Sequence, residues 1–76
     1  MEVQQNAVAQ DRVARLYATG RGIHKDLVEA MKWYLIARAG GEKDDWLDSV
    51  LGTLTPEQKV AVETEVREYN GALSLR

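Results

Sequence analysis

Gly20 and Gly22, two glycines separated by one residue, are the first feature of this 76-residue chain with a known chemical use. A Gly-x-Gly pair either lets the backbone approach a phosphate or turns the chain sharply between two elements. A dinucleotide-binding loop needs a preceding strand and a further glycine three residues on, where this chain has Lys25. A P-loop must end in Gly-Lys-Ser/Thr, which is also missing. The pair is therefore more typical of a turn between two helices.

The ionisable candidates for catalysis or metal binding are one histidine and one group of aspartates. His24 is the only histidine, and it lies in the glycine turn next to Lys25. A general base would need an orienting partner and a pocket, and an exposed loop residue is the favoured interpretation. Asp44, Asp45 and Asp48 lie close together in sequence, and the first and last could share a helical face. No glycine-containing calcium loop surrounds them, and helix capping explains them better. We predict no metal and no cofactor, with metal binding kept as an alternative.

The hydroxyl candidates for a nucleophile are Thr19, Ser49 and Ser74. None of them has the strand, sharp turn and helix that expose a hydrolase serine. We therefore predict that the chain has no catalytic residue and is not an enzyme. A small helical enzyme that uses His24 stays open as a less favoured alternative.

Composition and charge exclude further classes of protein function. The net charge of -2 does not favour a nucleic-acid binder, and the absence of cysteine excludes disulfides and thiolate metal sites. Residues 1–38 carry six Lys/Arg and four Asp/Glu, whereas 39–76 carry four and eight, so weak head-to-tail attraction is one interpretation. No apolar run has the length of a membrane span, and the N-terminus has no signal-peptide pattern. We expect a cytoplasmic or periplasmic location, with the choice between them open.

The residue usage favours helices throughout, because alternating β-branched runs are missing. The first helix is expected from about Val3 to Ala18, with the glycine turn after it. The second is expected to begin near Asp26, with Glu29 at the spacing of a capping box, and to stop at Gly40. The apolar face of the first helix is Ala9, Val13, Leu16 and Tyr17. That of the second is Leu27, Ala30, Met31, Tyr34 and Ala37, with Trp33 beside it.

Two further helices are expected in the second half of the chain. A short one follows Asp44 or Asp45 as its N-cap and ends near Gly52. The last begins at the sequence TPEQ, where a threonine cap, a proline and a glutamine form a capping box. It is expected to end at Asn70 and Gly71.

The first half of the chain is similar to a Sel1-like repeat. That family's pattern places small, aromatic and glycine residues at fixed positions along a helix-turn-helix. The departures are Ala14 where glycine is preferred, Glu29 where lysine is preferred and Arg38 in place of an alanine. The matching positions are Ala9, Tyr17, Gly20, Gly22, Asp26, Ala30, Trp33, Tyr34 and Ala37.

The resemblance implies an all-α, TPR-like α-α solenoid unit of about four helices. Residues 1–41 would form the repeat and 42–76 the C-terminal capping helices of one small domain. A single repeat cannot bury both faces of its helices, so the N-terminal helix should keep an apolar face for a preceding repeat, a partner or a second copy.

Sel1-like arrays act as scaffolds or adaptors, often in bacterial signalling or envelope processes. The resemblance therefore implies a non-enzymatic protein–protein interaction module. In such repeats the first helix lines the concave surface, which makes its polar side chains the candidate partner-binding residues: Arg12, Arg15 and Thr19, together with Lys32 on the second helix. Self-association through the N-terminal helix is the alternative, and the sequence does not identify the partner.

Overall fold

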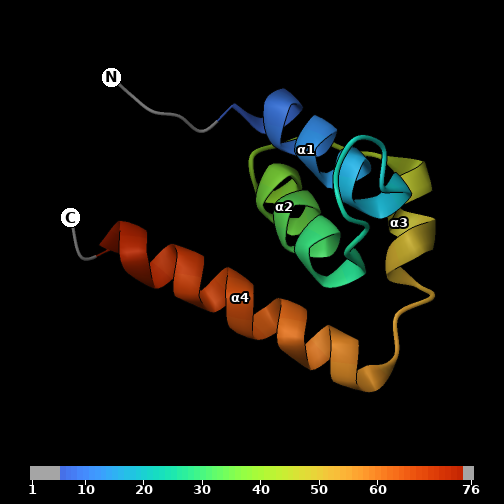
Figure 1. Cartoon of the computed structure of the whole chain (residues 1–76). Coiled ribbons are helices and arrows are strands. Elements are labelled where there is room, and N and C mark those ends of the chain that lie inside the picture. The colour runs from blue at the N-terminus through green and yellow to red at the C-terminus, as the bar shows by residue number, and fades with distance from the viewer. Residues whose placement is uncertain (1–5, 75–76) are drawn as a thin grey trace.

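The computed structural model of the chain describes residues 6–74, with the side chains of residues 73 and 74 left aside. The described part contains helices and no strand, so the all-α prediction is confirmed. Figure 1 shows α1 and α4 on opposite sides of α2, with the short α3 across one end of the α1–α2 pair. The helices are α1 (Ala7–Thr19), α2 (Leu27–Ala39), α3 (Asp45–Leu51) and α4 (Pro56–Ser74).

Helix α1 begins later than expected. The predicted start at Val3 lies outside the described residues, and Asn6 has an extended backbone, so no helix runs through it. The Asn6 Oδ1 accepts a hydrogen bond from the amide N of Ala9 at 3.1 Å, which caps the first turn. At the other end Gly20 has φ 71°, a left-handed conformation that favours glycine. The glycine pair therefore ends α1 and turns the chain.

The predicted inward face of α1 is wrong in part. Ala9 and Leu16 are exposed, whereas Asp11, Ala14 and Ala18 are buried. The reason is steric, because a helix that packs closely on its neighbour accepts only short side chains at the crossing. The larger apolar residues of α1 are consequently turned outward or lie at the edge of the interface.

Helix α2 is the centre of the fold. The Asp26 Oδ1 caps it by accepting from the amide N of Glu29 at 3.0 Å. The expected capping box closes in one direction only, because the Asp26 amide donates to the Tyr17 carbonyl O at 3.0 Å. The α2 residues that lose all exposure to solvent are Ala30, Met31, Tyr34 and Ala37. This helix needs cover on several sides, as its wide apolar face predicted.

The capping signals of α3 and α4 are confirmed. Asp44 caps α3, and Gly52 follows its last turn. At the start of α4 the Thr55 amide donates to Gln58 Oε1 at 2.9 Å, and the Gln58 amide donates to Thr55 Oγ1 at 3.1 Å. The capping box predicted at TPEQ is therefore complete in both directions.

The predicted end of α4 is wrong. The helix continues through Gly71 to Ser74, and Gly71 is not among the glycines with positive φ. Glycine permits a left-handed cap without requiring one, so a glycine near a helix end does not fix the boundary.

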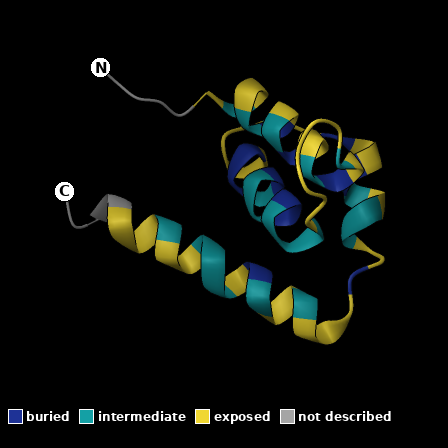
Figure 2. Cartoon of the chain, viewed as in Figure 1, coloured by how far each residue is buried: buried dark blue, intermediate teal, exposed yellow. Residues whose placement is uncertain are grey.

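Helix α4 packs on α2 through larger side chains. Val62 is buried, and the ring centroids of Trp33 and Tyr69 lie 5.8 Å apart in an edge-to-face arrangement. The surfaces of α1 and α4 that face away from α2 are largely exposed (Figure 2). None of the described helices is long and apolar enough to cross a bilayer.

Candidate functional site

Three of the four predicted partner-binding residues share one exposed face of α1. Arg12, Arg15 and Thr19 follow at spacings of three and four residues, which places them on one side of a helix. Val8 and Leu16 lie on the same side, four residues before and after Arg12, and are 52% and 41% exposed. We call these five residues the α1 outer face. It combines two aliphatic side chains with two arginines on one open surface.

Arg15 is held in one position by α3. Its Nε donates to Asp44 Oδ2 at 2.7 Å and its Nη2 donates to Asp44 Oδ1 at 2.8 Å. The guanidinium carbon lies 5.2 Å from the centroid of the Trp46 ring, within cation–π range. Trp46 is itself 42% exposed, so the pair extends the α1 outer face onto α3.

The pairing also sets the protonation of Asp44. Burial by itself would raise the pKa of Asp44, but hydrogen bonds from Arg15 and from the Leu47 amide outweigh it and hold the pKa below its usual value. The Arg15 guanidinium and the Asp44 carboxylate therefore stay charged, and their bidentate geometry ties α1 to the first turn of α3.

The other two polar residues of the α1 outer face, Thr19 and Arg12, differ in whether they have a hydrogen-bond partner. The Thr19 Oγ1 donates to the Arg15 carbonyl O at 2.8 Å, which returns the hydroxyl to its own helix. Arg12 is exposed and makes no hydrogen bond or ion pair with another of the described residues. Among the described residues, none therefore competes with an incoming acidic group for the donors of Arg12.

Lys32 lies elsewhere. Its Nζ contacts Glu29 Oε2 at 2.7 Å and Glu65 Oε1 at 3.8 Å, and it sits 4.6 Å from the centroid of the Trp33 ring. Its side chain is only 16% exposed. The residue connects α2 with α4 and is not part of the α1 outer face.

Asp11 is a feature that the sequence reasoning missed. It lies on the buried side of α1, and its Oδ1 has no hydrogen-bond partner within the described residues. Its Oδ2 lies 4.0 Å from the Arg15 Nε. Burial and the neighbouring Asp44 raise the pKa of Asp11 to about 6. The i, i+4 spacing of Asp11 and Arg15 is the only signal in the sequence, and it normally indicates a solvated pair.

The aspartates considered for a cation are engaged with internal partners. Asp48 accepts from the Tyr34 hydroxyl at 2.7 Å, from Arg38 at 3.0 Å and from Lys43 at 3.1 Å. These bonds, the one from Tyr34 first, hold the pKa of Asp48 below its usual value. Within residues 6–74, no group of three or more acidic or histidine side chains is placed to hold a metal ion.

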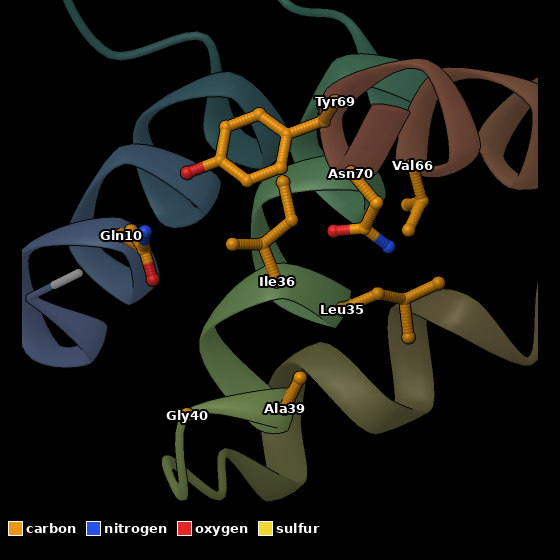
Figure 3. A pocket seen from close by; sticks show the side chains of 8 residues that line it. All are labelled: Gln10, Leu35, Ile36, Ala39, Gly40, Val66, Tyr69 and Asn70. Atoms are coloured by element: carbon orange, nitrogen blue, oxygen red, sulfur yellow. The ribbon is translucent and has the colours of Figure 1, made fainter. Parts of the chain in front are cut away.

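The candidate general base and the candidate nucleophiles do not lie together in the structure. His24 is exposed in the glycine turn, and the Ser49 Oγ donates to the Trp46 carbonyl O at 2.6 Å. The side chain of Ser74 lies outside the description. None of these residues lines the cavity drawn in Figure 3.

That cavity lies between α1, α2 and α4 and has a volume of about 170 Å³. Tyr69 and Gln10 face it from α4 and α1, and Ile36 lies between them (Figure 3). It is smaller than the roughly 300–1,000 Å³ of typical ligand sites, and its lining has no charged side chain. The lining consists of Gln10, Leu35, Ile36, Ala39, Gly40, Val66, Tyr69 and Asn70. The α1 outer face is the better candidate site.

Comparison with known proteins gives no relative. No family model, no curated protein and no solved structure matches this chain. The function therefore has to be argued from the residues themselves.

Proposed function

We propose that this chain is a non-enzymatic protein-interaction module built as one Sel1-like helix pair with C-terminal capping helices. The left-handed glycines at 20 and 22 and the Asp26 cap support the repeat assignment, because they form the turn that the family's pattern requires. Residues 1–41 are then the repeat and 42–76 the cap.

The observation that carries the proposal is the α1 outer face. Val8 and Leu16 expose apolar surface beside Arg12 on α1, whose opposite side is already packed. Trp46 of α3 adds apolar surface next to Arg15. Tryptophan and arginine are the residue types that most often dominate binding energy at protein interfaces. Partly exposed apolar side chains next to them would gain from being covered.

The fixed position of Arg15 favours binding further. An exposed arginine normally loses rotamer freedom when a partner immobilises it, at a cost of about 0.5–1.5 kcal/mol. Here Asp44 and Trp46 already hold the guanidinium, so a partner meets a side chain that is already ordered. The surface is thus partly preorganised for recognition.

The charge of this surface specifies the chemistry of the partner. Asp44 neutralises Arg15, whereas the charge of Arg12 is uncompensated among the described residues. A carboxylate on the partner can accept two parallel hydrogen bonds from a guanidinium. We therefore expect the partner to be a segment with an acidic residue beside an aliphatic or aromatic anchor. Such a segment would bind as a helix packed against the α1 outer face.

The test is selection from a displayed peptide library on the whole chain. Peptides that combine acidic residues with an apolar anchor are expected, and their affinity should fall at least tenfold on the double variant Arg12→Glu, Leu16→Glu. Arg67→Glu on α4 is the matched control, because it reverses an exposed charge away from this surface. Peptides whose affinity changes equally on both variants would contradict the proposed site.

A further inference from the structure

We propose that copies of this chain associate head to tail, with the first half of α4 in one copy packed on the α1 outer face of the next. This inference rests on the proposed function and names a second copy as the partner of the same surface. Val60 is the most exposed large apolar residue of the described chain, at 61%. It lies two residues before the buried Val62, which turns it to the side of α4 that faces away from α2.

The residues around Val60 form a surface that matches the α1 outer face in charge and polarity. Glu57 lies three residues before Val60 and Thr64 four residues after it, which places them on the same side of α4. The exposed Arg67 follows one turn later on that side. Glu63 lies at its edge, where it also lines a hollow with Leu35 and Arg38 of α2. Pro56, Glu57 and Val60 also line an open hollow in the surface. We call Pro56, Glu57, Val60, Glu63 and Thr64 the α4 tail face.

The two faces are complementary. The uncompensated positive charge of the α1 outer face is that of Arg12, because Arg15 is paired with Asp44. The α4 tail face carries Glu57 and Glu63 beside Val60. An aliphatic contact bordered by opposite charges is the arrangement that steers association and fixes register. A contact between two α1 outer faces would instead bring arginines together.

The position of the two faces decides the kind of assembly. They lie on opposite sides of α2, so a copy cannot cover its own α1 outer face with its own tail (Figure 1). Both faces can be occupied at once. Such a heterologous contact forms rings when the rotation closes and open chains when it does not.

The contact involves few residues, so we expect weak association. About five side chains on each side is well below the roughly 20–30 of a standard interface. For a contact this small we expect a dissociation constant of about 0.1–1 mM. The test therefore uses sedimentation equilibrium of the full chain from about 10 µM to 2 mM.

The experiment uses two single variants that each block one face. Arg12→Glu makes the α1 outer face acidic, and Val60→Glu makes the α4 tail face more acidic. Both side chains are exposed, so neither change should affect folding. We expect wild-type mass to rise with concentration, and each variant alone to associate at least tenfold more weakly.

The decisive sample is an equimolar mixture of the two variants. Each copy keeps one intact face, and the two blocked faces repel, so the mixture should form dimers and nothing larger. Lys25→Glu, in the turn outside both faces, changes the charge by as much as Arg12→Glu and should associate like wild type.

Two results would overturn the inference. One is a wild-type chain that stays monomeric over the whole range, and the other is a mixture that stays monomeric while wild type associates. If the peptides selected above still lose affinity on Arg12→Glu, Leu16→Glu, the proposed function stands with a foreign acidic partner. If they do not, both proposals fail.

Discussion

The α1–α2 pair and the α2–α4 pair are packed with different side chains. Ala14 and Ala18 of α1 are buried against α2, whereas α4 reaches α2 through Val62 and the edge-to-face contact of Tyr69 with Trp33. Short side chains allow a close crossing and leave the larger residues of α1 free to face outward. A helix whose packed side consists of alanines can therefore present its larger apolar side chains to a partner.

The largest effect is expected from filling the close crossing. Ala14→Leu adds three carbon atoms where no exposed surface remains, and overpacking of this kind costs about 1–3 kcal/mol or more. Because a domain of this size is only marginally stable, we expect most of the helical circular dichroism signal to be lost at 37 °C.

The matched control for that change is Ala9→Leu on the same helix. Ala9 is exposed, so the extra side chain should leave the free energy of unfolding within about 0.5 kcal/mol of wild type. Equal destabilisation by the two substitutions in a urea titration would mean that the packed side of α1 is assigned incorrectly.

The α2–α4 pair should be weakened by a cavity instead. Val62→Ala removes two buried methyl groups and should lower the free energy of unfolding by roughly 1–3 kcal/mol. Val60→Ala makes the same chemical change at an exposed site two residues away, and we expect almost no loss. Urea midpoints that move together would show that α4 is not oriented on α2 as described.

The polar contacts of Asp11 and Arg15 on α1 with Asp44 at the start of α3 give a pH-dependent prediction. The folded-state pKa of Asp11, about 6, lies above its ordinary 3.8. The native state therefore binds more protons between these values, and stability should fall as pH rises from about 4 to 7. Asp11→Asn removes this cost and should raise the free energy of unfolding by about 1–2 kcal/mol at pH 7.5, with almost no gain at pH 4.

Thermal melts of Asp11→Asn across that pH range provide the measurement. Asp45→Asn is the control, because its carboxylate is exposed and, among the described residues, pairs only with Lys43 on the surface. The lowered pKa values of Asp44 and Asp48 act in the opposite direction, since their stabilisation is lost as pH falls below about 4. A wild-type stability that rises between pH 4 and 7 would contradict the position given to Asp11.

The smallest effect is expected at the end of α4. Gly71 is helical, and an added Cβ would meet no atom within 4 Å. Gly71→Ala should therefore stabilise the chain by roughly 0.5 kcal/mol. Gly20→Ala should destabilise it, because that residue has positive φ and its Cβ would lie 3.0 Å from the Lys25 Cβ. Chemical denaturation of both variants gives the comparison.

The sequence predicted those parts of the fold that local chemistry decides. Asp26, Asp44 and Thr55 were recognisable as caps, since a capping side chain bonds within its own first turn. The packed side of α1 was not recognisable, because it depends on how closely α2 approaches. The end of α4 at Gly71 was missed for a similar reason, because glycine is compatible with both a stop and a continuation.

For the candidate site as well, the sequence predicted only what helical spacing decides. Arg12, Arg15 and Thr19 share a face because helical spacing requires it, and Lys32 could not be separated from them without knowing where α4 lies. The contact of Arg15 with Asp44 joins residues 29 positions apart, which no local pattern encodes. Asp11 lies beside this contact, with its Oδ2 4.0 Å from the Arg15 Nε.

The most direct test of the account is a nitrogen-15 NMR titration that maps where a selected acidic peptide binds. The Val60→Glu variant would be used, because its blocked tail face suppresses self-association. We predict that the largest shifts fall on the amides of residues 8–19 and on the Trp46 indole. Shifts concentrated instead on Leu35, Ile36 and Tyr69, which line the cavity between α1, α2 and α4, would contradict the assignment of the α1 outer face as the binding surface.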